Sequence, residues 1–180
     1  HITPSMLKIM KRGKGVEKLN ELMNHMRTKP NSFVRTTFIA GHPGETIEDH
    51  EALCKYIEEF KFDRANVFSY STEEGTTAAL SKELIEQEII DERAEVIGEI
   101  IAQTTQESLE NEIGKTFEVY VDGESEEHEY LLSARKTLWA PQIDGEIYIN
   151  DNEGNLPIVF GEIYEVEATQ LAGDKLLAKI

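Results

Sequence analysis

The sequence predicts an α/β unit with a parallel sheet, followed by a small antiparallel five-stranded β-barrel. In residues 1–80, helical and strand patterns alternate, which is typical of βα units whose strands form a parallel sheet. After Gly114 the apolar residues change from helical spacing to strict alternation, and residues 115–180 hold five short strand patterns separated by turn residues. We therefore expect one domain over residues 1–80, a connecting helix over 81–112 and a second domain over 113–180.

Caps and breakers define the elements of the first part. Pro4 after Thr3 is typical of a helix start, and Pro30 ends the second helix. Thr46, with Asp49 three residues later, resembles a capping box. The predicted elements are a helix from residue 4 that ends at Gly13, helices over residues 14–29 and 47–60, and strands over residues 33–40 and 64–70.

The second part begins with a long polar helix over about residues 82–112. Its inner face is predicted to carry Leu84, Ile89, Ile97, Ile100, Ile101 and Leu109. The predicted strands cover residues 116–121, 129–136, 146–150, 162–169 and 175–180, with turns at residues 122–123, 144–145, 152–154 and 173–174.

The net charge of −17 is confined to the second part of the chain. Residues 1–80 hold 11 basic and 11 acidic side chains, whereas residues 81–180 hold 7 basic and 24 acidic ones. Nucleic-acid binding depends on Lys and Arg, so this balance argues against a nucleic acid as a direct partner. It favours a basic protein partner, although an acidic surface also serves solubility alone.

The single cysteine, Cys54, excludes a disulfide within the chain and cannot by itself hold an iron–sulfur cluster. It lies on the apolar face of a predicted helix, so we expect it in the core. His42 has no second His or Cys nearby, so no metal site is expected. The sequence has neither a signal-peptide pattern nor an apolar run of membrane-spanning length, so we expect a cytoplasmic location and no membrane partner.

The most informative stretch is the bend over residues 41–44, which follows the strand over 33–40. Parallel sheets bind ligands at the carboxyl ends of their strands, and Gly41 and Gly44 would let a ligand approach the backbone. Ser69, Tyr70, Glu73 and Glu74 follow the second strand at the same predicted edge. These residues alone leave two interpretations open, a ligand-binding edge or an ordinary βα turn.

Several stretches together resemble the radical-SAM methylthiotransferases. Residues 35–46 (RTTFIAGHPGET) and 62–76 (FDRANVFSYSTEEGT) resemble the late barrel strands of this family, and residues 1–13 resemble the segment before them. Residues 133–135 and 140–149 resemble the TRAM domain of the RimO-type branch, which modifies an aspartate of the small-subunit ribosomal protein S-twelve. The resemblance implies the truncated end of a radical-SAM partial (βα) barrel, followed by a small antiparallel five-stranded TRAM/OB-like β-barrel.

The resemblance also implies a reaction. In this family a 4Fe-4S cluster cleaves S-adenosylmethionine, the resulting radical removes a hydrogen from the aspartate β-carbon, and a second cluster helps to supply the methylthio group. The cluster cysteines lie upstream in the family. The chain opens with His1 and lacks these cysteines, so we expect an excised fragment that is inactive alone, without catalytic residues, from a monomeric parent.

Carried over to this sequence, the family pattern implies that Phe38, Ile39, Ala40, Gly41, Val67 and Phe68 bind S-adenosylmethionine. Arg35 is a further candidate there or for the substrate, because a guanidinium pairs well with a carboxylate. Tyr70 and Glu73, at the end of the second strand, and Trp139, because Trp often anchors interfaces, are predicted to contact the substrate. Trp139 is expected in an exposed loop or at the barrel rim. The sequence departs from the family pattern at Thr37, which replaces a glycine, and at Glu45, which stands one place late.

Two other functions stay open at this point. The sister branch of the family modifies a tRNA adenosine, but its members would be expected to have a basic TRAM domain and an Arg near Glu74. A TRAM-type binding module without enzymatic activity is the third possibility.

Overall fold

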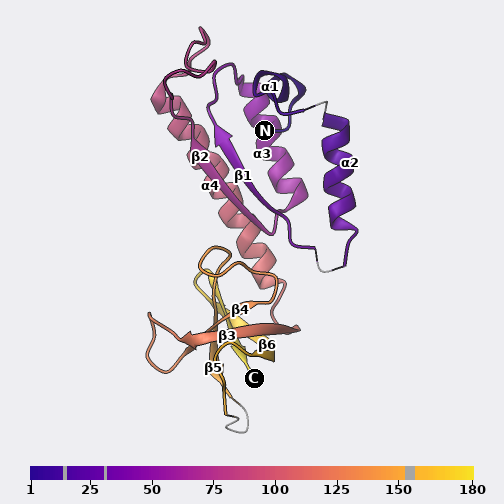
Figure 1. The fold of residues 1–180 in the computed structure, drawn as a ribbon, viewed down its shortest axis with the longest axis vertical. Helices are drawn as coiled ribbons and strands as arrows, with labels where there is room; N and C mark the ends of the chain where they lie inside the picture. Colours follow the sequence, from indigo (N-terminus) through magenta and orange to yellow (C-terminus); the bar gives the residue numbers. More distant parts are fainter. Residues whose placement is uncertain (14–15, 31, 153–156) are drawn as a thin grey trace. The chain divides into compact units, whose positions relative to one another are not determined.

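The computed structural model describes residues 1–13, 16–30, 32–152 and 157–180. The chain forms two compact units, residues 1–105 and residues 106–180 (Figure 1).

The first unit is built around two parallel strands. β1 (Arg35–Ala40) pairs with β2 (Arg64–Ser69) in register from Arg35 opposite Arg64 to Ala40 opposite Ser69. The helices of this unit are α1 (Pro4–Ile9), α2 (Val16–Arg27), α3 (Ile47–Phe60) and most of α4 (Gln87–Glu110), whose last turns belong to the second unit. This order confirms the predicted βα alternation and the parallel sheet.

α3 connects the two strands, and its start is fixed by the predicted capping box. The Thr46 hydroxyl accepts a hydrogen bond from the Asp49 backbone N–H at 3.2 Å, and the Asp49 carboxylate accepts one from the Thr46 N–H at 3.3 Å. The helix ends at Phe60. Lys61 is its C-cap, because its N–H still bonds to the Ile57 carbonyl while its left-handed backbone (φ 52°) turns the chain out of the helix. These two caps fix the start and the end of the helix that connects β1 to β2.

The hydrophobic core of the first unit lies between α2, α3, α4 and one face of the sheet. Its buried members are Met23, Val34, Phe38, Ala40, Leu53, Ile57, Phe62 and Ile97. Cys54 is half-buried at the edge of this cluster. Every second residue of β1 therefore packs inward, as the period of a strand requires.

The second unit is a closed five-stranded barrel, which confirms the predicted architecture. Its strands are β3 (Thr116–Glu124), β4 (Leu132–Lys136), β5 (Ile147–Asp151), β6 (Ile163–Ala172) and β7 (Lys175–Lys179), and their order around the barrel is β3-β4-β5-β7-β6. Four of the five pairings are antiparallel, as predicted, but β5 and β7 run parallel. The barrel is thus mixed, because β7 lies between the hairpin partner β6 and the distant strand β5.

Helix ends account for the main differences from prediction. α1 ends at Ile9 with Met10 as its C-cap, before Gly13, because Lys11 already adopts a left-handed backbone (φ 54°). α4 starts at Gln87 instead of residue 82, so the helical period does not apply to Leu84, which is 55% exposed.

The inner face of α4 differs from the prediction near the start of the helix. Ile89, expected on that face, is 42% exposed, and its neighbour Ile90 is buried. Ile97 and Leu109 are buried as predicted. The beginning of the predicted helix over 14–29 and most of the predicted turn over 152–154 fall outside the described residues. Among the described residues, no helix has the length and apolar character needed to cross a membrane.

Candidate functional site

The two strands of the first unit end side by side at one rim of the sheet. The Tyr70 N–H donates to the Ala40 carbonyl at 2.9 Å, which joins the residue after β2 to the last residue of β1. The bend over residues 41–44 leaves β1 at this point, and the His42 ring meets the Tyr70 ring edge-on at 5.3 Å. The structure therefore brings the two segments singled out in the sequence to the same rim.

The two faces of this sheet have different surroundings. In a parallel pair, residues at matching register positions point to the same side. Phe38, Ala40 and Val67 point to the packed side, where Phe38 is 4% exposed and Ala40 is wholly buried. Ile39 and its register partner Phe68 point to the other side, where Phe68 is 62% exposed.

The residues predicted to bind S-adenosylmethionine lie on both faces of the sheet. Arg35, Ile39 and Phe68 lie on the face away from the core, here called the open face. Ile39 and Phe68 are next to the rim, and Arg35 is at the opposite end of β1. Phe38 and Val67 belong to the core side, so they can reach a ligand on the open face only through their backbone. An exposed aromatic ring beside an aliphatic side chain suits a flat, apolar surface such as an adenine ring.

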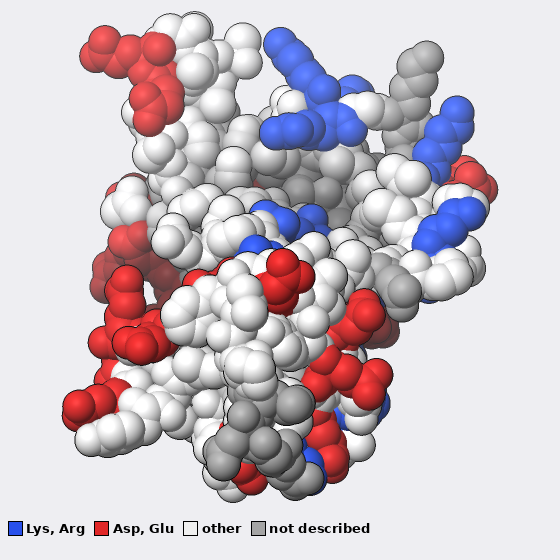
Figure 2. All heavy atoms as spheres, turned by 60° about the horizontal axis from the view of Figure 1, so that its bottom comes forward, with Lys and Arg blue, Asp and Glu red and all other residues white. Residues whose placement is uncertain are grey.

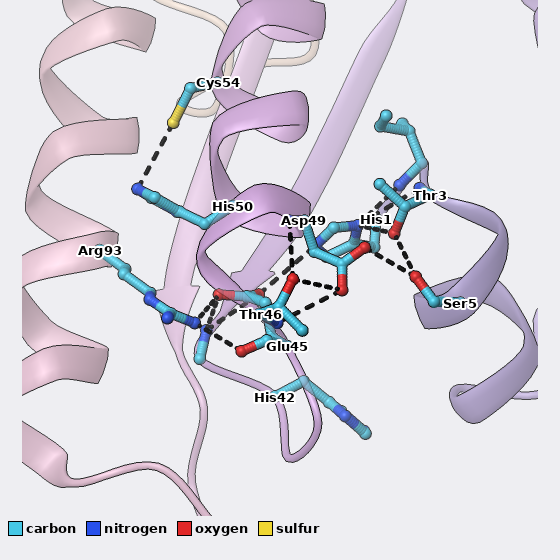
Figure 3. Close-up of polar contacts among 12 residues, drawn as sticks. His1, Thr3, Ser5, His42, Glu45, Thr46, Asp49, His50, Cys54 and Arg93 are labelled. Carbon is cyan, nitrogen blue, oxygen red and sulfur yellow. Dashed lines mark hydrogen bonds and ion pairs between the residues drawn. The ribbon is translucent and has the colours of Figure 1, made fainter.

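A buried carboxylate holds the bend in place (Figure 3). The side chain of Glu45 is fully buried, and both of its oxygens accept from the Gly41 N–H at 3.2 Å. Arg93 on α4 donates to the Glu45 carboxylate at 2.7 Å and to the Glu45 carbonyl at 3.0 Å. His1 Nε2 lies 3.4 Å from the second carboxylate oxygen. Glu45 therefore links the bend to α4 and to the segment before α1.

The charge of Glu45 follows from these contacts. Burial alone raises the pKa of a carboxyl group, because it penalises the charged form. The hydrogen bonds from His1, Arg93 and the Gly41 N–H outweigh burial and lower the pKa of Glu45 below its usual value of 4.5. Glu45 is thus ionised at neutral pH and acts as a fixed anchor, not as a proton donor.

The glycines of the bend serve packing of the protein itself. Gly41 has a φ of +75°, and a Cβ built on it would lie 2.5 Å from the Ile90 side chain of α4. Gly44 has a φ of +85°, and its N–H donates to the Glu83 carbonyl at 3.0 Å. The N–H groups of both glycines are therefore bonded within the protein, and beside them at the rim Phe68 is exposed and Ile39 is half-buried.

Two further polar contacts lie near the bend, one between α1 and α3 and one within α3. The Ser5 hydroxyl donates to the Asp49 carboxylate at 2.7 Å, and the His50 ring lies 3.6 Å from the Cys54 sulfur one turn along α3 (Figure 3). Burial lowers the pKa of His50 and raises the pKa of Cys54. Within the described part of the chain, no group of three or more His, Cys, Asp or Glu side chains could hold a metal ion.

The residues predicted to contact the substrate lie in different surroundings. Tyr70 is half-buried at the rim, and Glu73 is exposed in the following loop, where its carboxylate accepts from the Ser71 hydroxyl at 3.2 Å. Of the two places expected for Trp139, the exposed loop was wrong, because its side chain is only 6% exposed. The backbone N–H of Trp139 donates to the Lys136 carbonyl at 2.9 Å and closes a turn, and this turn places the indole inside.

Sequence reasoning missed Arg93 and a groove on the barrel. Arg93 lies on a strongly polar helix, where a charged residue gives no sign of a buried partner. The groove has a volume of about 620 Å³ and is lined by the end of β3, the loop after it, β4, the turn over residues 141–146 and Lys175. Figure 2 shows acidic side chains over much of the surface drawn, with basic side chains directly beside some of them.

Comparison with known proteins identifies relatives of the chain. Residues 113–180 match the family of TRAM domains. Over its whole length the chain is 78% identical to a protein of Aliarcobacter butzleri named ribosomal protein uS12 methylthiotransferase RimO. Proteins of the same name are 55% identical in Sulfurovum sp. and 46% identical in Campylobacter jejuni, over 100% and 99% of the chain. The resemblance to the RimO-type branch and to its TRAM domain is thus confirmed.

The chain covers only part of these relatives. It spans 41% of the Aliarcobacter butzleri protein and 40% of each of the other two.

Proposed function

We propose that this chain is the C-terminal part of a methylthiotransferase that acts on ribosomal protein uS12. The observation that carries this proposal is the 78% identity, over the whole chain, to a protein named for that activity. The complete enzyme would place a methylthio group on the β-carbon of an aspartate, using S-adenosylmethionine and 4Fe-4S clusters. Cys54 is the only cysteine of the 180 residues, so the thiolates that bind the clusters would come from outside this chain.

In this proposal residues 1–80 form the last part of a radical-SAM barrel and residues 113–180 form the TRAM domain. Residues 81–112 connect these two parts. The open face of β1 and β2 would line the S-adenosylmethionine pocket. Ile39 and Phe68 would contact the adenine, because they are the apolar side chains of that face nearest the rim. Bound S-adenosylmethionine and its cluster would supply the radical chemistry, while this chain binds and orients the nucleoside.

The anchor at Glu45 would keep this surface in place. It ties the bend that follows Ile39 and Ala40 to α4 through Arg93, with distances of 2.7 and 3.0 Å. A wall that binds a cofactor must be rigid, because a displacement of about 1 Å can cost about 100-fold in rate. Two hydrogen bonds from one guanidinium supply that rigidity.

The charge of the chain favours the protein substrate over tRNA. All of the net negative charge lies in residues 81–180. Ribosomal proteins that bind RNA carry Lys and Arg for the phosphates, so an acidic surface attracts such a protein and repels RNA. The same reasoning makes the tRNA-modifying activity the weaker proposal.

The test uses the complete enzyme with purified uS12 and, separately, tRNA. We expect transfer of one methylthio group to a single aspartate of uS12, seen by peptide mass spectrometry, and none to tRNA. Phe68→Ala should weaken binding of S-adenosylmethionine by roughly tenfold or more, because stacking of a base on an aromatic side chain contributes about 1–3 kcal/mol.

Leu80→Ala is the matched control, because Leu80 is also an exposed apolar residue of the first unit, at 83% exposure, but lies outside β1 and β2. It should leave the affinity unchanged. Modification of tRNA instead of uS12 would refute the proposed activity. Equal affinities of the Phe68 variant and the Leu80 variant would refute the assignment of the pocket.

A further inference from the structure

The first 30 residues carry a charge of opposite sign to the rest of the chain. They contain seven Lys and Arg and two Asp and Glu, a net charge of +5, whereas residues 31–80 contain four and nine, a net charge of −5. The balanced count over residues 1–80 hides this reversal. None of the residues assigned above to the S-adenosylmethionine pocket belongs to this basic segment.

Five cations of the segment form what we call the basic surface. All five are exposed, and none of them takes part in an ion pair within the described residues. They are Lys8 in the last turn of α1, Lys11 and Arg12 just after it, Lys18 on α2 and Lys29 just after α2. Arg27 differs from them, because its guanidinium is 2.6 Å from the Asp63 carboxylate. The five cations of the basic surface are therefore available to an anionic partner.

The basic surface begins beside the bend that follows β1. A Cβ built on Gly44 would lie 3.1 Å from the side chain of Ile9, the last residue of α1, and Lys8 directly precedes that residue. The Ser5 hydroxyl bonds to the Asp49 carboxylate at 2.7 Å, which fixes α1 to α3. A partner bound to the basic surface would therefore lie close to the rim at which the substrate is expected.

The anion that fits several separate cations best is the phosphate backbone of a nucleic acid. Six residues separate α1 from α2, and Figure 1 draws α1 beside the start of α2. A nucleic-acid duplex carries one negative charge about every 1.7 Å along its axis, so one stretch of backbone can meet cations from both helices. The acidic residues 81–180 repel phosphates, so such contacts would be confined to the basic surface.

We propose that the basic surface binds ribosomal RNA beside uS12, so that the enzyme acts on uS12 within the small ribosomal subunit. The inference rests on the proposed function, which supplies as the substrate a protein that is itself held by RNA. An acidic protein could pair with the same cations, but the substrate's own surroundings favour RNA. Contacts with phosphates carry no base sequence, so the basic surface would position the enzyme on the subunit.

The test compares two double variants of the complete enzyme that remove the same charge. Lys8→Gln with Lys18→Gln removes one charge from α1 and one from α2. Lys55→Gln with Lys115→Gln is the control, because these lysines are also exposed but lie outside the basic surface, in weak pairs with nearby glutamates. Gln keeps the helix propensity of Lys, and thermal unfolding checks that both variants are folded.

Three binding partners are compared over a series of salt concentrations. They are purified small ribosomal subunits, the deproteinised RNA of these subunits, and free uS12. Methylthio transfer to uS12 is measured with the subunits and with the free protein.

We expect the basic-surface variant to bind subunits and deproteinised RNA about tenfold more weakly at physiological salt. Its plot of log affinity against log salt should be less steep by about two, because each phosphate contact contributes about one to that slope. The control variant should keep the wild-type slope. With subunits the basic-surface variant should show a raised KM and an unchanged kcat, and with free uS12 it should match the wild type.

Equal affinities and slopes of the two variants on deproteinised RNA would refute the basic surface as an RNA contact. A loss of affinity for free uS12, or for subunits but not for their RNA, would refute it as well, because a protein would then occupy this surface. An enzyme that modifies free uS12 but not uS12 in subunits would overturn this inference and leave the proposed function intact. An enzyme that modifies neither would overturn the proposed function.

Discussion

At the scale of single residues, the Glu45 carboxylate has the largest set of partners around the bend. It binds the Gly41 amide, Arg93 and His1, which lie in three separate parts of the sequence. A charge with no exposed surface is stable only when it is paired and hydrogen-bonded. Loss of any one partner should therefore affect the fold of the first unit as well as the bend.

Glu45→Gln should lower the free energy of unfolding at pH 7 by about 3–5 kcal/mol, because it leaves the Arg93 guanidinium largely buried without its counter-charge. Urea unfolding at a series of pH values measures this loss. Because the pKa of Glu45 is lower in the folded chain, its charge stabilises the fold at neutral pH and this contribution disappears as pH falls below about 4.5. The difference between wild type and variant should therefore shrink in acid.

The matched control is Glu59→Gln, which breaks an exposed pair with Lys55 at 3.7 Å. This variant should lose less than about 1 kcal/mol, because water screens exposed pairs. If the two variants lose similar amounts, or if the Glu45 effect does not depend on pH, the anchor is not ionic.

Prediction from sequence was limited at this scale by neighbours that are distant along the chain. The residue types of β1 predicted a strand, but only the packing of α2, α3 and α4 decides whether its Phe38 face or its Ile39 face is buried. Arg93 could not be recognised, because nothing in a polar helix distinguishes a residue that reaches a buried carboxylate. Trp139 was misjudged for the same reason, since its burial depends on how one turn folds against the barrel.

At the scale of elements, the contact between the bend and α4 depends on the absence of a side chain at Gly41. The helix approaches so closely that Ile90 occupies the place of a Cβ at this position. Sequence reasoning assigned the glycine to ligand access, because it predicted the bend correctly but could not place a helix that begins more than 40 residues later. Caps and strand periods, by contrast, act locally, and the capping box at Thr46 was predicted correctly for that reason.

Gly41→Ala should destabilise the protein more than Gly75→Ala. Both glycines have positive φ values, +75° and +81°, so both variants carry backbone strain of about 1–3 kcal/mol. Only Gly41 has a neighbour in the way, which adds roughly 1–3 kcal/mol of overpacking. Thermal and urea unfolding of the two variants measure the difference.

Ile90→Ala in the Gly41→Ala background should recover part of the overpacking and none of the backbone strain. Equal destabilisation by the Gly41 and Gly75 substitutions would show that α4 moves away from the bend at little cost.

At the scale of the whole molecule, the two units should differ in their ability to fold alone. The barrel is closed, so each of its strands has two neighbours, and its inward side chains are buried. The sheet of the first unit has only two strands, so each of them leaves one edge unpaired within the described residues. Unpaired edges promote association between chains.

A fragment of residues 106–180 should unfold in one cooperative, reversible transition and elute as a monomer. A fragment of residues 1–105 should elute as oligomers or aggregate, because its open face and strand edges lack their neighbours. Size-exclusion chromatography and circular dichroism test both fragments. A monomeric first fragment would show that α1, α2 and α4 already protect the sheet.

The fold classes of both units were predictable because they follow from periodicity and turn residues. The parallel pairing of β5 and β7 was not, because it depends on which strands meet across the barrel and not on any local pattern.

That pairing imposes an order on events during synthesis. When the chain has been made as far as Ala172, four barrel strands exist but the gap between β5 and β6 is still open. Only Lys175–Lys179 can fill it, so the last step of barrel formation waits until this segment has cleared the ribosome's exit tunnel.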